Sequence, residues 1–130
     1  MDDLKSIYPP LPCGSIVYRA IRKKSWIDPD NDNRLLPIAY ELREGESGLS
    51  VLVCDQCPSE TESKELSGLS KCYGIDSLHV GRVRNLGLAV EQDEKHHASI
   101  NGLPHPEDDL LLAKNLSYSL AEQSRPQWRL

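Results

Sequence analysis

The stretch Leu49-Ser-Val-Leu-Val-Cys54 decides the fold, because it is the strongest candidate for a buried strand in the chain. Its apolar run is short and is bounded on both sides. The polar turn of residues 44–48 precedes it, and Asp55 follows it. A short, bounded apolar run of this kind is typical of a strand in the interior of a sheet. We therefore expect the rest of the domain to be built around residues 49–54.

A second strand is predicted over residues 15–21, Ser-Ile-Val-Tyr-Arg-Ala-Ile. Strand side chains alternate between the two faces of a sheet. Tyr18 is therefore expected on one face with its apolar neighbours at 16 and 20. Arg19 is expected on the other face, between Val17 and Ile21.

The remaining segments divide into further strands and two helices. Apolar patterning predicts strands over residues 35–43, 78–84, 86–92 and 97–101, although Pro37 leaves a helix open for the first of them. Ser59 and Glu62 match a capping box, so a helix is predicted over residues 60–72, ending near Gly74. A second helix is predicted over residues 107–124, with an apolar stripe of Leu112, Ala113, Leu116 and Leu120.

This order of elements predicts an α+β fold. We expect a single compact domain whose sheet is antiparallel or mixed, with about two helices including a C-terminal amphipathic helix. The boundaries are an extended lead-in over residues 1–14, the domain over residues 15–124 and a C-terminal tail over residues 125–130.

Composition and charge exclude several classes of protein. The 130 residues are 38% hydrophobic and 27% charged, as in an ordinary globular domain, and no apolar run is long enough to cross a membrane. The net charge of -5 makes nucleic acid an unfavourable partner. The acidic N-terminus lacks the pattern of a signal peptide, which predicts a cytoplasmic protein with reduced thiols. The sequence specifies neither a cofactor nor an oligomeric state.

Four residues form a candidate zinc site. Cys54 and Cys57 make a C-x2-C pair, and Cys72 and His79 lie downstream as further ligands of the type that zinc prefers. The spacing of the second pair differs from that of a zinc ribbon. The alternative is that these cysteines are packed or loop residues without a metal.

Basic residues and one histidine suggest a second kind of site. Arg19, Arg82 and Arg84 lie on predicted strands, where they are candidates to bind phosphate groups. His97 is the more favourable of two adjacent histidines for facing a pocket, since neighbours on a strand point to opposite faces. The alternatives are a solvated basic face and a histidine hydrogen-bonded at the sheet edge.

Several segments carry a resemblance to known proteins. The strings at residues 17–21, 39–43, 47–51, 83–88 and 97–104 resemble a group of small bacterial proteins without an assigned function. More distantly, a first strand with Tyr-Arg and a later aromatic resembles ADP-ribosyltransferase-like domains, including toxin components of the RES type. The resemblance implies that Arg19 holds the NAD pyrophosphate and that Tyr40 supports the nicotinamide, with Glu41 and Glu91 as candidates for the catalytic glutamate.

Three functional hypotheses follow. The leading one is a small cytosolic accessory protein that binds a protein partner without catalysis of its own, with the Trp128-containing tail as an anchor. The first alternative is an NAD-using enzyme or a toxin or defence component, with Arg19, Tyr40 and His97 around one pocket. The second alternative is a zinc-stabilised binding module.

Overall fold

The computed structural model describes residues 8–130, which form one six-stranded sheet, a two-stranded ribbon and three α-helices. The strand order of the large sheet is β6-β7-β4-β1-β5-β8, and every neighbouring pair is antiparallel. The strands are β1 Ile16–Ala20, β4 Gly48–Leu52, β5 Gly74–His79, β6 Ala89–Glu94, β7 His97–Asn101 and β8 Arg125–Arg129. The predicted α+β class is confirmed.

The helices and the small ribbon complete the domain. The helices are α1 Glu60–Ser67, α2 Val80–Arg84 and α3 Leu110–Gln123, the 3-10 turns are η2 Lys24–Trp26 and η3 Pro37–Tyr40, and the ribbon pairs β2 Ile27–Asp28 with β3 Arg34–Leu35. Residues 8–14 form neither helix nor strand, and the first seven residues of the predicted lead-in lie outside the described residues. None of the helices within residues 8–130 combines the length and the apolar character needed to span a bilayer.

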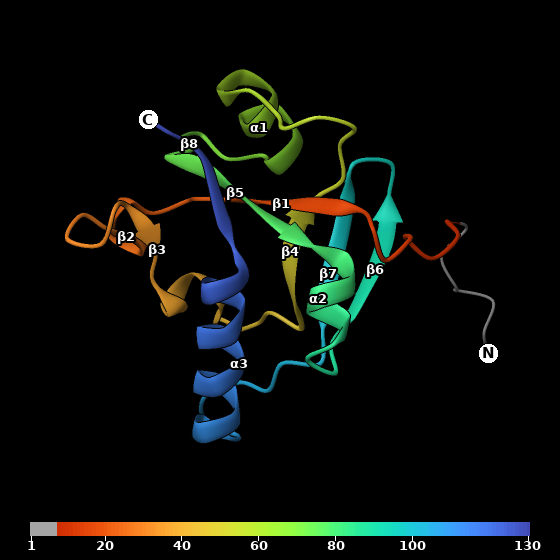
Figure 1. Ribbon diagram of the computed structural model, residues 1–130, viewed down its shortest axis with the longest axis vertical. Helices are drawn as coiled ribbons and strands as arrows, with labels where there is room; N and C mark the ends of the chain where they lie inside the picture. The colour runs from red at the N-terminus through yellow and green to blue at the C-terminus, as the bar shows by residue number, and fades with distance from the viewer. Residues whose placement is uncertain (1–7) are drawn as a thin grey trace.

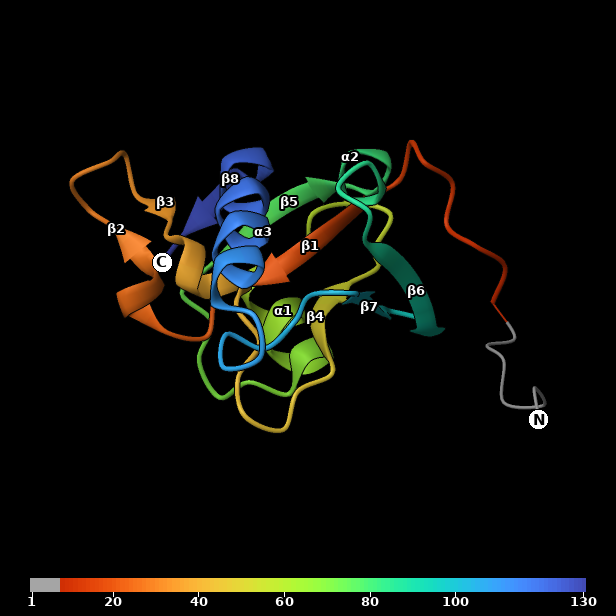
Figure 2. The same cartoon turned by 90° about the horizontal axis from the view of Figure 1, so that it is seen from below.

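The large sheet has a hydrophobic core on each face. The large core contains strand residues such as Val17 and Leu49 together with residues of α2, α3 and η3. The small core contains Tyr18, Leu52, Cys72 and Ile75, and Leu66 of α1 packs against it. Figures 1 and 2 show α1 on one side of β1 and β5, with α3 on the other. The sheet is therefore the middle layer of the domain.

The alternation predicted for the first strand is confirmed. Val17 and Ile21 lie in the large core, whereas Tyr18 lies in the small core. Arg19 is on the same face as Val17 and is 7% exposed. Its partner across the β1–β5 ladder is Asp76, so their side chains leave the sheet on the same face.

Two of the predicted strands are partly helical in the structure, and the strand predicted from residue 86 begins at Ala89. The chain leaves the sheet at His79, and residues 80–84 form α2, which buries Val80 and Val83 in the large core. These two valines are three positions apart, a spacing that places both on one face of a helix but on opposite faces of a strand. Within the predicted strand 35–43, residues 37–40 form η3 with Pro37 at its start, because proline suits the first turn of a helix.

Helix α1 begins where the capping box predicts but ends earlier. Ser59 Oγ accepts the Glu62 backbone N–H at 3.2 Å, and Glu62 Oε1 accepts the Ser59 N–H at 3.0 Å. The helix stops at Ser67 rather than residue 72, because Gly68 adopts a left-handed conformation with φ of 71°.

The C-terminal helix is confirmed, although it covers Leu110–Gln123 and not residues 107–124, and the predicted tail is wrong. Helix α3 is capped by Asp109, whose side chain accepts the Leu112 N–H at 3.1 Å. Leu112, which was predicted in the apolar stripe, is 45% exposed. Residues 125–129 form β8, which pairs with β5 at the edge of the sheet. This strand contains Pro126, which an edge strand tolerates although the residue has no N–H.

Candidate functional site

Arg19 is a buried structural cation. Its Nε and Nη2 donate to Ala39 O at 3.2 and 2.8 Å, and its Nη1 donates to Ser50 O at 2.8 Å. The guanidinium carbon lies 5.3 Å from the ring centroid of Trp26 and 5.9 Å from that of Tyr40. Burial lowers the pKa of Arg19. Its hydrogen bonds thus connect η3 and β4 to β1, rather than being free for a ligand.

Tyr40 is the second residue of the predicted NAD site. It is completely buried, and its hydroxyl lies beside Ser124 without a hydrogen bond of ordinary geometry. Burial raises the pKa of Tyr40, and the nearby Asp76 raises it further. The ring therefore packs in the core as a neutral phenol and does not face solvent.

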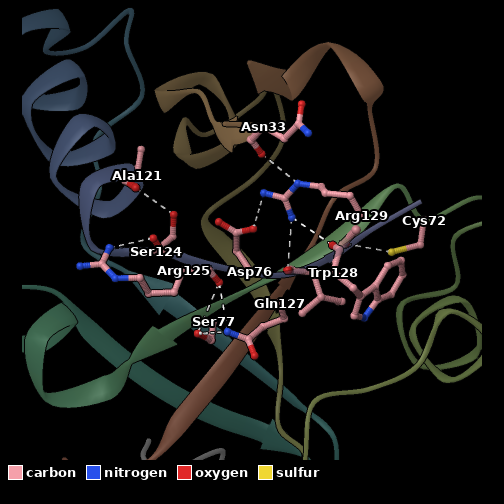
Figure 3. A network of polar contacts seen from close by, with 12 residues as sticks. Asn33, Cys72, Asp76, Ser77, Ala121, Ser124, Arg125, Gln127, Trp128 and Arg129 are labelled. Carbon is pink, nitrogen blue, oxygen red and sulfur yellow. Dashed lines mark hydrogen bonds and ion pairs between the residues drawn. The ribbon is translucent and has the colours of Figure 1, made fainter. Parts of the chain in front are cut away.

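A buried ion pair, absent from the sequence-based candidates, lies on the same face. Asp76 is completely buried, and its Oδ1 lies 2.7 Å from Nη2 of Arg129. Arg129 also donates to the backbone oxygens of Asn33 at 2.9 Å, Trp128 at 3.1 Å and Ile75 at 3.3 Å. Figure 3 shows the Arg129 guanidinium between the Asp76 carboxylate and Asn33. Asp76 therefore attaches β8 to the sheet.

His97 and Arg19 both line a small pocket, but Tyr40 does not. The pocket has a volume of about 100 Å³ and is lined by Arg19, Ser50 and His97, among others; Tyr40 is not among its lining residues. Ligand pockets usually have volumes of about 300–1,000 Å³. His97 pairs with Leu52 of the small core, so its side chain leaves the sheet on the face opposite to that of Arg19. The pocket therefore does not bring these two side chains together, and it is smaller than expected for a dinucleotide.

The turn between β6 and β7 holds a cluster of possible metal ligands. His97 Nδ1 lies 2.6 Å from Asp93 Oδ1, and Glu94 is adjacent. Among the described residues, these three are the group whose ligand atoms all lie within 4.8 Å of one another. Both carboxylates are exposed, and such exposed clusters are common without an ion.

The two arginines predicted to bind phosphate with Arg19 lie on α2, away from it. Arg84 Nη1 donates to Leu11 O at 2.6 Å and contacts Cys13 Sγ at 3.4 Å, so it binds the segment before β1. Arg82 is exposed. The helix follows His79, which pairs with Ile16 at the start of β1, whereas Arg19 lies three residues further along. The structure does not unite these arginines in one phosphate site.

The predicted zinc ligands are only partly brought together. Cys54 and Cys57 are half-buried beside the small core, which contains Cys72. Cys72 Sγ lies 3.2 Å from Gly74 O, at the start of β5, whereas His79 is the last residue of that strand. A strand of this length separates its ends by more than the roughly 2.0–2.3 Å bonds of a zinc site can bridge. His79 therefore cannot complete the cysteine set.

An exposed apolar surface is a further feature that the sequence-based candidates missed. It lies on α3 and η3, and we call it the α3 surface: Ile38, Leu110, Leu111, Leu112 and Tyr118, which are 47%, 58%, 73%, 45% and 57% exposed. Leu111 and Tyr118 are two turns apart on the same stripe of the helix. A signal was present, because three consecutive leucines cannot all face the core from one helix.

The chain matches no protein-family model, no curated protein and no solved structure with which it was compared. The resemblance to ADP-ribosyltransferase-like domains therefore rests on the residues alone.

Proposed function

We propose that the protein is a cytosolic binding protein without catalysis of its own, and that its α3 surface binds an apolar segment of a protein partner. The observation that carries this proposal is the exposure of Leu111, at 73%, on the stripe of α3 that also carries the exposed Tyr118, which lines a hollow together with Ile38. Contiguous exposed apolar side chains are typical of protein interaction sites. The four free cysteines suit a reducing compartment.

The rim of the α3 surface favours a basic partner segment. Residues 107–109, directly before the leucines, are acidic and exposed, and Glu122 is exposed at the other end of the helix. Lys114 lies between them, but its charge is balanced by Glu41, with 2.9 Å between Nζ and Oε2. Complementary charge at an interface directs association and register. We therefore expect apolar side chains flanked by Lys or Arg in the partner.

Hollows on both sides of Tyr118 can take partner side chains. One has a volume of about 470 Å³ and is lined by Pro37, Ile38 and Lys114, among others. The other, of about 260 Å³, lies between Leu35 and Glu122. Aromatic residues next to such hollows are frequent anchors of binding energy.

Site-specific photo-crosslinking in the native host tests this proposal. A photoreactive amino acid at Leu111 or Tyr118 is expected to capture one partner at an apolar, basic segment. The same probe at Glu65, on α1 and the opposite face of the sheet, is the matched control and is expected to capture nothing specific. The proposal is overturned if only Glu65 gives adducts, if the crosslinked segment is acidic, or if the adduct is a second copy of this chain.

The NAD-using alternative rests on one observation, that Arg19 and His97 both line one small pocket. Against it, three donor atoms of Arg19 already bind backbone carbonyls of the protein itself. Calorimetric titration of the full chain with NAD⁺ is expected to show no binding. Binding that is lost in His97→Ala and retained in Asp93→Asn would favour the enzyme instead.

A further inference from the structure

A second pocket, on the face of the sheet away from α3, is rich in groups that bind metals. It has a volume of about 460 Å³ and is lined by Cys54, Cys57, Glu62 and His96, among others. These residues come from the segment after β4, from the first turn of α1 and from the turn between β6 and β7. The sequence separates His96 from the cysteines by about forty positions, so only the fold places them around one pocket.

The tautomer of His96 leaves one nitrogen free to bind a metal. Its Nδ1 lies 3.0 Å from Val53 O, and a carbonyl oxygen only accepts hydrogen bonds. In the neutral imidazole, Nδ1 therefore carries the proton and Nε2 keeps its lone pair. Metal-binding histidines characteristically donate their other ring N–H to a carbonyl or a carboxylate in this way. The backbone N–H of Val53 also donates to His96 O at 2.9 Å, which fixes the position of the turn.

The thiols lie in a pocket whose charge favours a cation. Asp55, Glu62 and Glu65 line this pocket together with the two cysteines, so carboxylates surround the sulfurs. A divalent cation offsets that negative charge, and it binds thiolates by replacing their protons.

We propose that Cys54, Cys57 and His96 bind a thiophilic divalent cation of the Zn²⁺ type, with Glu62 or water as the fourth ligand. Two thiolates, one imidazole and one oxygen make a donor set that suits tetrahedral zinc. The three ligand side chains must rotate toward a common point, since within the described residues only Asp93, Glu94 and His97 already have ligand atoms within 4.8 Å of one another. This site does not depend on the α3 surface.

Cobalt substitution of the full chain, purified under reducing conditions, tests the proposal. Co²⁺ bound to thiolates gives charge-transfer absorption in the near ultraviolet, which carboxylate and imidazole ligands alone do not give. We expect this band with the parent protein, and its displacement by Zn²⁺. Competition with a chromophoric chelator then measures the Zn²⁺ affinity of each variant.

Substitutions of the proposed ligands test where the ion binds. Cys54→Ser, Cys57→Ser and His96→Gln are each expected to weaken Zn²⁺ binding at least about tenfold, since even an outer partner of a ligand contributes that much. The matched controls are Cys13→Ser, an exposed cysteine elsewhere, and His97→Gln, the neighbouring histidine in the other cluster. Circular dichroism checks that each variant is folded. The proposal is overturned if the parent gives no thiolate band, if both cysteine variants keep it, or if His97→Gln removes it.

Trp128 provides an independent local signal. Its Nε1 donates to Pro58 O at 2.9 Å, next to Cys57. Co²⁺ at the proposed site is expected to quench Trp128 emission, and Trp128→Phe to remove that response. Quenching that persists in Trp128→Phe would place the ion near Trp26 and contradict the assignment.

Discussion

At the scale of single residues, Arg19 determines how the 3-10 turns are held against the sheet. It crosses the large core to reach two backbone carbonyls, with its charge between the rings of Trp26 and Tyr40. Buried charges are stable only when their donors are satisfied, and here the satisfying groups are carbonyls and aromatic rings. The residue that resembles a cofactor ligand in the sequence is therefore a link within the fold.

Substitution of Arg19 is expected to destabilise the protein. Arg19→Leu leaves Ala39 O and Ser50 O without this donor in the core, and we expect a loss of about 2–4 kcal/mol in the free energy of unfolding. Urea denaturation followed by circular dichroism measures it. Arg82→Gln, which changes an exposed arginine, is the control and is expected to change stability by less than about 0.5 kcal/mol. Equal stability of Arg19→Leu and the parent would contradict this structural role.

Because Tyr40 is buried, we expect the free energy of unfolding to fall at alkaline pH. Its pKa is raised by burial, so the folded protein keeps the phenol proton where the unfolded chain loses it, above about pH 10. Below that pH the phenol is protonated in both states, and the stability that Tyr40 contributes is fully present. As pH rises further, the unfolded state binds fewer protons, and the free energy of unfolding falls by about 1.4 kcal/mol per pH unit for this group.

Tyr40→Phe isolates this effect. At pH 7 the variant is expected to be within about 1 kcal/mol of the parent, because the hydroxyl lacks a well-formed hydrogen bond. Between pH 10 and 11.5 its stability should decline less steeply. Urea denaturation across this range provides the comparison, in which Tyr18, whose pKa is also raised, titrates in both proteins. Parallel pH profiles would show that Tyr40 ionises normally.

At the scale of elements, β8 converts the C-terminal residues from an apparent tail into part of the sheet. Trp128 pairs with Ile75 and Arg129 with Gly74. The β5–β8 ladder is irregular between Ile75 and Asp76, next to Pro126, so the edge strand is held by side chains as well as by its backbone. Removing residues 125–130 therefore perturbs the fold and is not a selective test of partner binding.

A pair of variants tests how β8 is held. Arg129→Met leaves the Asp76 carboxylate buried without its partner and is expected to destabilise the protein by about 3–5 kcal/mol. The double variant Asp76→Leu/Arg129→Met removes both charges and should recover at least half of that loss. Thermal and urea denaturation measure both variants, with Gln127→Ala, an exposed β8 residue, as the control. A double variant less stable than Arg129→Met would show that Asp76 has a stabilising partner other than Arg129.

At the scale of the whole molecule, both cores share one sheet. β1 contributes Val17 to the large core and Tyr18 to the small core, so neither core can form without the strand that serves the other. Each core also contains or contacts one tryptophan, Trp26 in the large core and Trp128 beside the small core. Folding of the two faces is therefore expected to be coupled.

Single-tryptophan variants test this coupling. In Trp26→Phe the fluorescence reports the small core, and in Trp128→Phe it reports the large core. Within each variant, the fluorescence and circular dichroism transitions in urea are expected to coincide, as in a two-state domain of this size. Separate midpoints within one variant would show that one face unfolds before the other.

The sequence by itself determined the elements whose signals are local. The alternation of residues 15–21 placed Arg19 between Val17 and Ile21, and the Ser59–Glu62 pair placed the start of α1. The α+β class followed from the order of such segments. These signals work because a strand period, a capping hydrogen bond and a helical stripe each involve residues only a few positions apart.

Only the tertiary structure decided the rest. Residues 80–84 turned helical because Val80 and Val83 pack on the large core, and residues 125–129 became a strand because the edge of β5 was open to them. The same holds for the candidate sites. Arg19 donates to backbone carbonyls, His79 lies at the far end of β5 from Cys72, and His96 lines the same pocket as Cys54 and Cys57. These outcomes depend on contacts between residues far apart in the chain, which no local pattern encodes.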